Sequence, residues 1–250
     1  MEKPEVIIDA GHGGKDPGAV GKLFHEEDWT LQTSVYMLDR FTALGIPAEL
    51  TRDKDVDVEL NARAKMVRKS GARVCISNHV NAGGGTGAEV IVSLYSNRVW
   101  GGLVLEELKA AGAGSRKVYS RESETMQGKD YYAMHRQTGT VETIIVEYGF
   151  IDSADAPGLL ENWKRYAEAV IKATCKYLSL PYSPPVGNTM PAKTSRPYGI
   201  PEGLADYQVS DFLDLVDDKL ITSPEEWGPK LPEPAPLWFV CAMINRIRKE

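Results

Sequence analysis

Short apolar runs alternate with longer amphipathic segments along residues 1 to 180 of the chain. The runs have the length of strands and are bounded by glycine, proline or polar residues. They cover residues 5–9, 46–51, 72–78, 87–94 and 141–147. Each predicts a strand, and the runs at 5–9 and 141–147 are apolar enough for strands buried on both faces.

The amphipathic segments predict helices over residues 28–44, 59–70, 99–111 and 158–178. The first has an apolar face, and Gly45 follows it as a helix stop. That face consists of Leu31, Val35, Leu38 and Phe41. The second helix places Leu60, Ala64 and Val67 together.

Strands that alternate with helices predict an α/β fold, with a twisted, largely parallel mixed sheet flanked by helices. Ligand sites in such folds lie beyond the carboxyl ends of the strands. Three polar residues fall there: His12 after the first run, His79 after the run at 72–78, and Glu147 at the end of the last run. We therefore expect these side chains to lie close together.

The composition changes at Pro181, because eleven of the fifteen prolines lie from this residue onward. We predict a first domain over 1–180, a proline-rich linker over 181–201 and a small helical module over 202–250. The module contains two helix candidates, 206–220 and 237–248. A helix pair of this size is small for independent stability, so it should associate with a second copy, dock on the first domain or bind a partner.

The net charge of −6 argues against nucleic acid as the main partner. No apolar stretch approaches the roughly 20 residues of a membrane span, so we expect no membrane insertion. The N-terminus shows no signal-peptide pattern, which predicts a cytoplasmic location until release, with export by something other than a signal peptide as the alternative. Cys75, Cys175 and Cys241 have apolar neighbours and no ligand-like spacing, so they are interpreted as buried thiols.

The loop in VIIDAGHGGKDPGAVG, residues 6–21, holds five glycines and one histidine. A phosphate-binding loop does not fit, because Asp16 stands where its first glycine is required and Leu23 replaces its hydroxyl residue. The dinucleotide fingerprint that starts at Gly11 and Gly13 also meets Asp16 in place of its third glycine. The glycines are better explained by a need for room around His12.

Two histidines and a carboxylate at strand ends are the ingredients of a catalytic zinc site with two His and one Glu. Glu26 or Glu27 could supply that carboxylate to a metal held by His12. Glu147 leaves an otherwise apolar strand, and its desolvation would suit a general base. Each residue also has a structural interpretation: the glutamate pair can answer a helix dipole, and Glu147 can pair with a cation. The residues alone indicate a metal hydrolase of unspecified substrate.

Five segments in order resemble the zinc-dependent N-acetylmuramoyl-L-alanine amidases of the amidase-3 type, which cut peptidoglycan. They are IIDAGHGGKDPGAVG, an acidic pair 14 residues after His12, LTRDKDVDVELNAR (50–63), SNHVNA (77–82) and VEYGFIDS (146–153). The resemblance covers residues 5 to about 178. It implies zinc (Zn²⁺) held by His12, Glu26 and His79, with Glu147 as the catalytic glutamate.

The implied reaction is hydrolysis of the amide between the lactyl group of N-acetylmuramic acid and L-alanine, with zinc-activated water and Glu147 as general base. The family's ligand glutamate is usually followed by lysine, whereas this chain has Glu26-Glu27-Asp28. Glu26 is preferred, and Glu27 stays the alternative. Ala10 and Asn78 also depart from the family's usual proline and apolar residue.

Other polar residues near these motifs have open roles. His25 is interpreted as exposed or as a neighbour of the ligands, and His135 as a possible substrate contact. Asn81 either contacts substrate or orients the His79 loop. Two arginines, Arg52 and Arg63, are expected to form ion pairs with the acidic run at 53–57, with a substrate carboxylate as the alternative partner.

An amidase of this kind with a small C-terminal module resembles a bacteriophage endolysin, and a bacterial autolysin is the rival setting. The implied partner is bacterial peptidoglycan, and the C-terminal module is expected to bind the wall or to form a homodimer. Two rival functions remain: a zinc carboxypeptidase or deacetylase that acts on wall fragments, and a wall-binding protein whose site is silent. Intact His12, His79 and Glu147 argue against the silent site.

Overall fold

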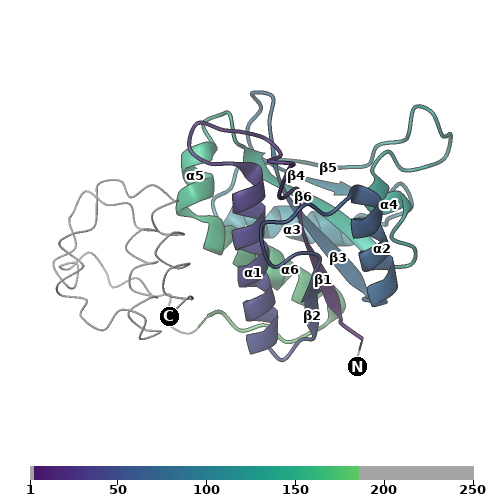
Figure 1. Cartoon of the computed structure of the whole chain (residues 1–250). Coiled ribbons are helices and arrows are strands. Elements are labelled where there is room, and N and C mark those ends of the chain that lie inside the picture. Colours follow the sequence, from purple (N-terminus) through teal and green to yellow (C-terminus); the bar gives the residue numbers. More distant parts are fainter. Residues whose placement is uncertain (1–2, 186–250) are drawn as a thin grey trace, which may run out of the picture. The chain divides into compact units, whose positions relative to one another are not determined.

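The computed structural model describes residues 3–185, and the predicted module at 202–250 lies outside them, as do Cys241 and all but the first five residues of the predicted linker. Six strands form one sheet, in the order β2-β1-β3-β6-β4-β5 (Figure 1). They are β1 (Val6–Ala10), β2 (Ala48–Leu50), β3 (Val74–Asn81), β4 (Ala88–Val92), β5 (Ser115–Tyr119) and β6 (Glu142–Phe150). All neighbouring strands are parallel except β4 and β6, so the prediction of a largely parallel mixed sheet is confirmed.

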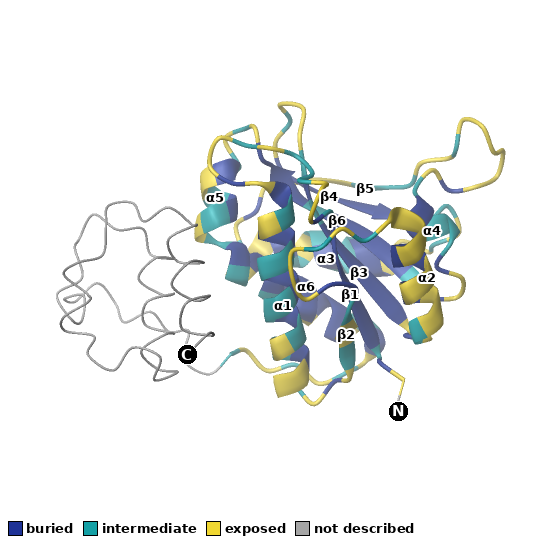
Figure 2. Cartoon of the chain, in the orientation of Figure 1, coloured by how far each residue is buried: buried dark blue, intermediate teal, exposed yellow. Residues whose placement is uncertain are grey.

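Helices cover both faces of the sheet (Figure 1). They are α1 (Glu26–Ala43), α2 (Leu60–Ser70), α3 (Val99–Ala110), α4 (Ala133–Arg136), α5 (Ala156–Glu161) and α6 (Trp163–Leu178). On one face, α1, α3 and α6 enclose the larger apolar core, and on the other α2 and α4 enclose a smaller one. The four central strands are largely buried (Figure 2), whereas the edge strands β2 and β5 are half-buried or exposed. Among residues 3–185, no helix has the length and apolar character needed to cross a membrane.

Most predicted elements are present, with two corrections. The single helix predicted over 158–178 is two helices, α5 and α6, because the chain breaks at Asn162, whose φ of −118° is not helical. Strand β5 and the four-residue helix α4 lie in a part of the chain for which no element was predicted.

The apolar face predicted for α1 is only partly correct. Phe41 is buried in the core and Leu38 packs against it, whereas Leu31 and Val35 are only partly buried. The buried face of α1 instead includes the small polar residues Thr30, Thr33 and Ser34. Hydrogen bonds explain this for two of these residues: Thr30 donates to the carbonyl of Gly11, and Ser34 accepts from Asn78.

Asn78 occupies an interior position of β3 and is fully buried. Its amide donates to Oγ of Ser34 at 2.8 Å and its carbonyl accepts from the Tyr148 hydroxyl at 2.9 Å. A buried polar side chain is tolerated when its groups are paired in this way. The departure from an apolar residue at position 78 is therefore matched by partners on α1 and β6.

A buried ion pair ties the end of β1 to α2. Nη1 of Arg63 lies 2.8 Å from Oδ1 of Asp9, whose side chain is fully buried. Asp9 also accepts hydrogen bonds from the hydroxyls of Thr51, which directly follows β2, and of Ser77 on β3. These bonds and the Arg63 charge outweigh the effect of burial and hold the pKa of Asp9 below its ordinary value. The prediction that Arg63 pairs with the acidic run at 53–57 is therefore wrong.

Replacement of Arg63 by Met should destabilise the fold by about 3–5 kcal/mol, because it leaves the Asp9 carboxylate buried without its cation. Urea unfolding followed by circular dichroism measures this change. Arg73→Met is the matched control, since Arg73 forms an exposed pair with Glu5 and should cost less than about 1 kcal/mol. Equal effects of the two substitutions would contradict the importance of the buried pair.

Candidate metal centre

His12 lies in the loop that follows β1, with a left-handed φ of 60° that is uncommon for a residue other than glycine. Two buried arginines stabilise this turn by donating hydrogen bonds to its carbonyl groups. Arg63 donates to Ala10 and His12, and Arg52 donates to Ala10 and Gly11. The carbonyls of the turn thus stay paired although the strand ladder has ended. The prediction that Arg52 forms an ion pair with the run at 53–57 is therefore also wrong, because its guanidinium donates to backbone carbonyls.

Glu26 is the first residue of α1, and its side chain is buried. Its Oε1 accepts the backbone N–H of Val80 at 2.9 Å, and its Oε2 accepts that of Ala19 at 2.8 Å. The carboxylate therefore joins the helix start to β3 and to the loop that precedes α1. Its orientation is fixed before any ligand binds.

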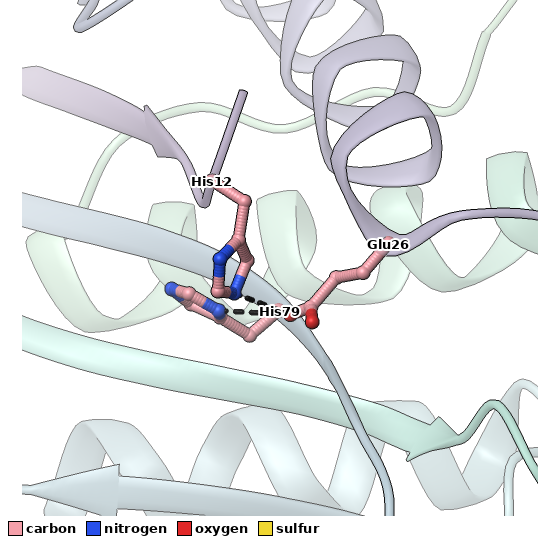
Figure 3. A group of neighbouring side chains, drawn as sticks. All are labelled: His12, Glu26 and His79. Carbon is pink, nitrogen blue, oxygen red and sulfur yellow. Dashed lines mark hydrogen bonds and ion pairs between the residues drawn. The ribbon is translucent and has the colours of Figure 1, made fainter. Parts of the chain in front are cut away.

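His79 lies inside β3, which extends three residues beyond the predicted strand. Its Nδ1 is 2.9 Å from Oε1 of Glu26, and Nε2 of His12 is 3.2 Å from the same oxygen (Figure 3). The two imidazole rings meet edge to face, with centroids 4.9 Å apart. The potential ligand atoms of the three residues all lie within 4.8 Å of one another.

Two glycines of the loop leave room for this group. A Cβ on Gly11 would lie 2.4 Å from Cε1 of His79. A Cβ on Gly18, whose φ is +64°, would lie 2.6 Å from Oε2 of Glu26 and 2.7 Å from the His12 ring. Both contacts are too short for a Cβ. The prediction that the loop glycines make room around His12 is therefore confirmed for Gly18, while Gly11 makes room for His79 and the other three glycines lie against other parts of the chain.

The charges of the group are strongly coupled. Burial lowers the pKa of His12, but hydrogen bonds and charges from Glu26 and Asp16 outweigh it and raise the pKa to about 9. For His79, Glu26 likewise outweighs burial and raises the pKa. Burial raises the pKa of Glu26, but the two imidazoles hold it far below its ordinary value. A metal cation that replaced the imidazole protons would be attracted by the same Glu26 carboxylate.

These side chains fit a zinc-type metal centre. Two imidazoles and one carboxylate are the protein ligands of many catalytic zinc sites, which keep a further position open. Asp16 accepts a hydrogen bond from Nδ1 of His12 at 2.8 Å, which leaves Nε2 of His12 to face Glu26. A carboxylate in this position orients a metal-binding histidine. Sequence reasoning missed Asp16, although its position four residues after His12 was visible.

Glu27 does not belong to the group that could hold a metal. Its backbone carbonyl accepts from Arg52, and the pKa of its carboxyl is raised by burial and by the nearby charge of Asp55. The structure thus brings together His12, Glu26 and His79, and leaves Glu27 outside.

Glu147 is the register partner of His79 on the adjacent parallel strand, so both side chains lie on the same face of the sheet. Glu147 was predicted to end its strand, but it lies inside β6, which continues to Phe150. Its Oε2 is buried and has no hydrogen-bond partner within residues 3–185. Burial raises the pKa of Glu147 to about 7, with Glu26 and Glu89 adding to the rise and His79 opposing it.

The remaining predicted residues lie outside this group. His25 precedes α1 and is exposed. His135 on α4 is largely buried, which lowers its pKa to about 4, and its Nε2 has no partner among the described residues. The Asn81 amide donates to Glu89 at 3.4 Å. Cys75 and Cys175 are buried thiols, as predicted.

Comparison with known proteins identifies one family model, described as N-acetylmuramoyl-L-alanine amidase, which matches residues 6–178. A sporulation-specific N-acetylmuramoyl-L-alanine amidase of Bacillus subtilis (strain 168) is 41% identical over 87 residues, 34% of this chain and 34% of its own length. An endolysin of Bacillus phage SPP1 is 40% identical over 86 residues, 34% of this chain and 32% of its own. The match therefore spans about a third of each of these two relatives.

Among solved structures, the N-acetylmuramoyl-L-alanine amidase AmiC2 of Nostoc punctiforme superposes with a TM-score of 0.63 at 28% identity. The superposition covers 71% of this chain and 98% of the other. The shared architecture extends over nearly all the residues that the structure describes.

Glu26→Ala should weaken Zn²⁺ binding by more than the roughly 10- to 100-fold typical of changes next to the ligands. Glu27→Ala is the matched control and should change the affinity little. Zinc must displace the His12 proton, so the affinity of the wild-type protein should rise as the pH rises toward about 9. Titration calorimetry at several pH values measures both effects. A larger loss in the Glu27 variant would move the ligand to Glu27.

Proposed function

Since the chain belongs to the amidase-3 family of N-acetylmuramoyl-L-alanine amidases, we propose that it cleaves peptidoglycan between the lactyl group of N-acetylmuramic acid and L-alanine. The observation that carries the proposal is the convergence of His12, Glu26 and His79 beside Glu147, at the edge of a sheet shared with this family. We assign His12, Glu26 and His79 as ligands of Zn²⁺ and Glu147 as the general base.

Zinc held there would act as a Lewis acid on the amide carbonyl and would lower the pKa of water. The chain's own residues supply the proton transfers. Glu147 accepts a proton from the attacking water and passes it to the nitrogen of the leaving L-alanine. A pKa of about 7 suits both steps, since the carboxyl can take and release a proton near neutral pH.

The group around the ligands supports this assignment by its rigidity. Glu26 is held by two backbone N–H groups, and His12 is oriented by Asp16. Asp152 accepts from Gly83 and Gly84, and so ties the loop after β3 to the end of β6. A site whose donors are already fixed loses little free energy to reorganisation during the reaction.

Mass spectrometry of digested peptidoglycan tests the proposed bond. New lactyl carboxyl groups and free L-alanine amines support the amidase. Cleavage elsewhere in the stem peptide would support a carboxypeptidase, loss of acetyl groups a deacetylase, and no cleavage a wall-binding protein with a silent site.

We further propose that the protein lyses bacterial walls as a bacteriophage endolysin. Support comes from the endolysin of phage SPP1, which matches over 86 residues; the sporulation amidase, which favours the bacterial setting, matches over 87. A gene for a holin-type membrane protein beside this one would support the phage setting. A neighbourhood of sporulation genes would support a bacterial autolysin instead.

Glu147→Gln should lower kcat/KM on soluble muropeptides by about 10²–10⁴-fold, because the isosteric amide cannot accept the proton. The variant should keep the fold and the zinc content of the wild type. Glu142→Gln, at the start of the same strand, is the control and should retain activity. For the wild type, kcat/KM should be lost as the pH falls through about 7, since the base must be ionised. A near-native rate in the Glu147 variant would remove Glu147 from the mechanism.

A chain that ends at Pro185 should fold, bind zinc and cleave soluble muropeptides at close to the full rate. This end point keeps Tyr182 and Ser183, which hydrogen-bond to Glu168 and Arg40 on the helices α6 and α1. The shorter chain should work less well on intact walls, because the proposed wall-binding module would no longer concentrate the enzyme there. Turbidity loss of whole walls measures this difference. Unchanged lysis would contradict the binding role, and loss of folding would contradict the domain boundary.

A further inference from the structure

The row of polar side chains that begins at His79 continues across the sheet. Glu147 on β6 pairs with Glu89 on β4, and Glu89 pairs with Lys117 on β5. Cross-strand partners share a face, so all four side chains lie on the face that carries the metal centre. Adjacent strands are about 4.8 Å apart, which places Lys117 about 10 Å from Glu147 along the row.

Glu89 is buried, with 3% of its surface exposed, and two cations contact it. Nη1 of Arg116 lies 3.0 Å from Oε1 of Glu89, and Nζ of Lys117 lies 3.7 Å from the same oxygen. One carboxylate therefore faces two positive charges. The cluster keeps a net charge of +1, carried by side chains that are 43% and 51% exposed.

An irregularity in the β4–β5 pairing brings both cations to the same carboxylate. The register steps from Ala88 opposite Ser115 to Glu89 opposite Lys117, which leaves Arg116 as an extra residue. In such a bulge, two consecutive residues oppose one residue of the partner strand and the side chains are redirected. Regular alternation would instead point Arg116 and Lys117 to opposite faces.

The guanidinium of Arg116 is held in place from two further sides. Its Cζ lies 5.2 Å from the centre of the Phe150 ring, a cation–π contact. A Cβ on Gly85 would lie 2.5 Å from Cζ of Phe150 and 2.9 Å from Nη1 of Arg116, so glycine there leaves room for the ring and for the guanidinium packed on it. Within residues 3–185, Glu89 is the only acceptor that contacts the guanidinium, so most of its five N–H groups remain available.

We propose that Arg116, assisted by Lys117, binds a carboxylate of the stem peptide and thereby sets the substrate preference of the enzyme. This proposal rests on the proposed amidase function. The second residue of the stem peptide is a glutamate whose α-carboxylate is free in some walls and amidated in others. From the scissile nitrogen, two residues of extended chain span about 7 Å. This length falls between the roughly 5 Å from Glu147 to Glu89 and the roughly 10 Å from Glu147 to Lys117 along the row. Arg116 reaches into this interval, since its Nη1 lies 3.0 Å from Oε1 of Glu89. A planar guanidinium matches a carboxylate with two parallel hydrogen bonds.

The test compares two soluble substrates under steady-state conditions. One is N-acetylmuramoyl-L-alanyl-γ-D-glutamyl-L-lysine, and the other is the same compound with the α-carboxylate of glutamate amidated. The wild-type enzyme should prefer the carboxylate form, by about 10- to 100-fold in kcat/KM. Arg116→Gln should remove most of this preference, mainly through a higher KM for the carboxylate form. Arg116→Lys should retain part of the preference, because lysine keeps the positive charge but cannot form the two parallel hydrogen bonds of a guanidinium.

Arg73→Gln is the matched control, since Arg73 pairs with a glutamate on the surface and should leave both rates unchanged. Lys117→Gln is the second variant. Thermal unfolding of the Arg116 and Lys117 variants shows whether each protein remains folded. Equal wild-type rates on the two substrates would overturn the proposal, and so would equal losses on both in the Arg116 variant. Cleavage of neither substrate by the wild type would instead contradict the amidase function on which the proposal rests.

Discussion

The buried pair of Asp9 and Arg63 is the contact on which the arrangement of the site depends. Removal of both charges from water is costly, and the pair is stable only because other groups satisfy its remaining donors and acceptors. Two of those groups are the carbonyls of Ala10 and His12, so the pair also shapes the turn after β1. Arg52 completes the arrangement from β2's side of the sheet. The loop that carries His12 is therefore fixed by interactions that lie beneath it.

Glu26 then joins this loop to the sheet. One of its oxygens receives a backbone N–H from β3 and faces both imidazoles, while the other receives a backbone N–H from the loop. The carboxylate thus links two parts of the fold and belongs to the group that could hold a metal. Only Glu26 of the glutamate pair at the start of α1 belongs to the group that could hold a metal, and its side chain is buried.

The sequence predicted the strands and their shared edge well, because apolar runs report burial directly. His12, His79 and Glu147 followed from that edge. Three features were out of reach. The buried face of α1 contains Thr30 and Ser34, whose hydrogen bonds are invisible to an apolar pattern. Strand β5 has the sequence SRKVY and is mostly exposed, so it resembles a loop. The pairing of Arg63 depends on tertiary contacts that no local spacing encodes.

The left-handed backbone of His12 has an evolutionary consequence. This conformation costs a residue with a Cβ about 1–2 kcal/mol, whereas glycine adopts it freely and asparagine relatively easily. Selection for the imidazole is what opposes that cost. In a descendant that no longer needs an imidazole here, drift at position 12 should favour glycine or asparagine over other residues. The identity of this one residue would then distinguish inactive paralogues from working enzymes in genome surveys.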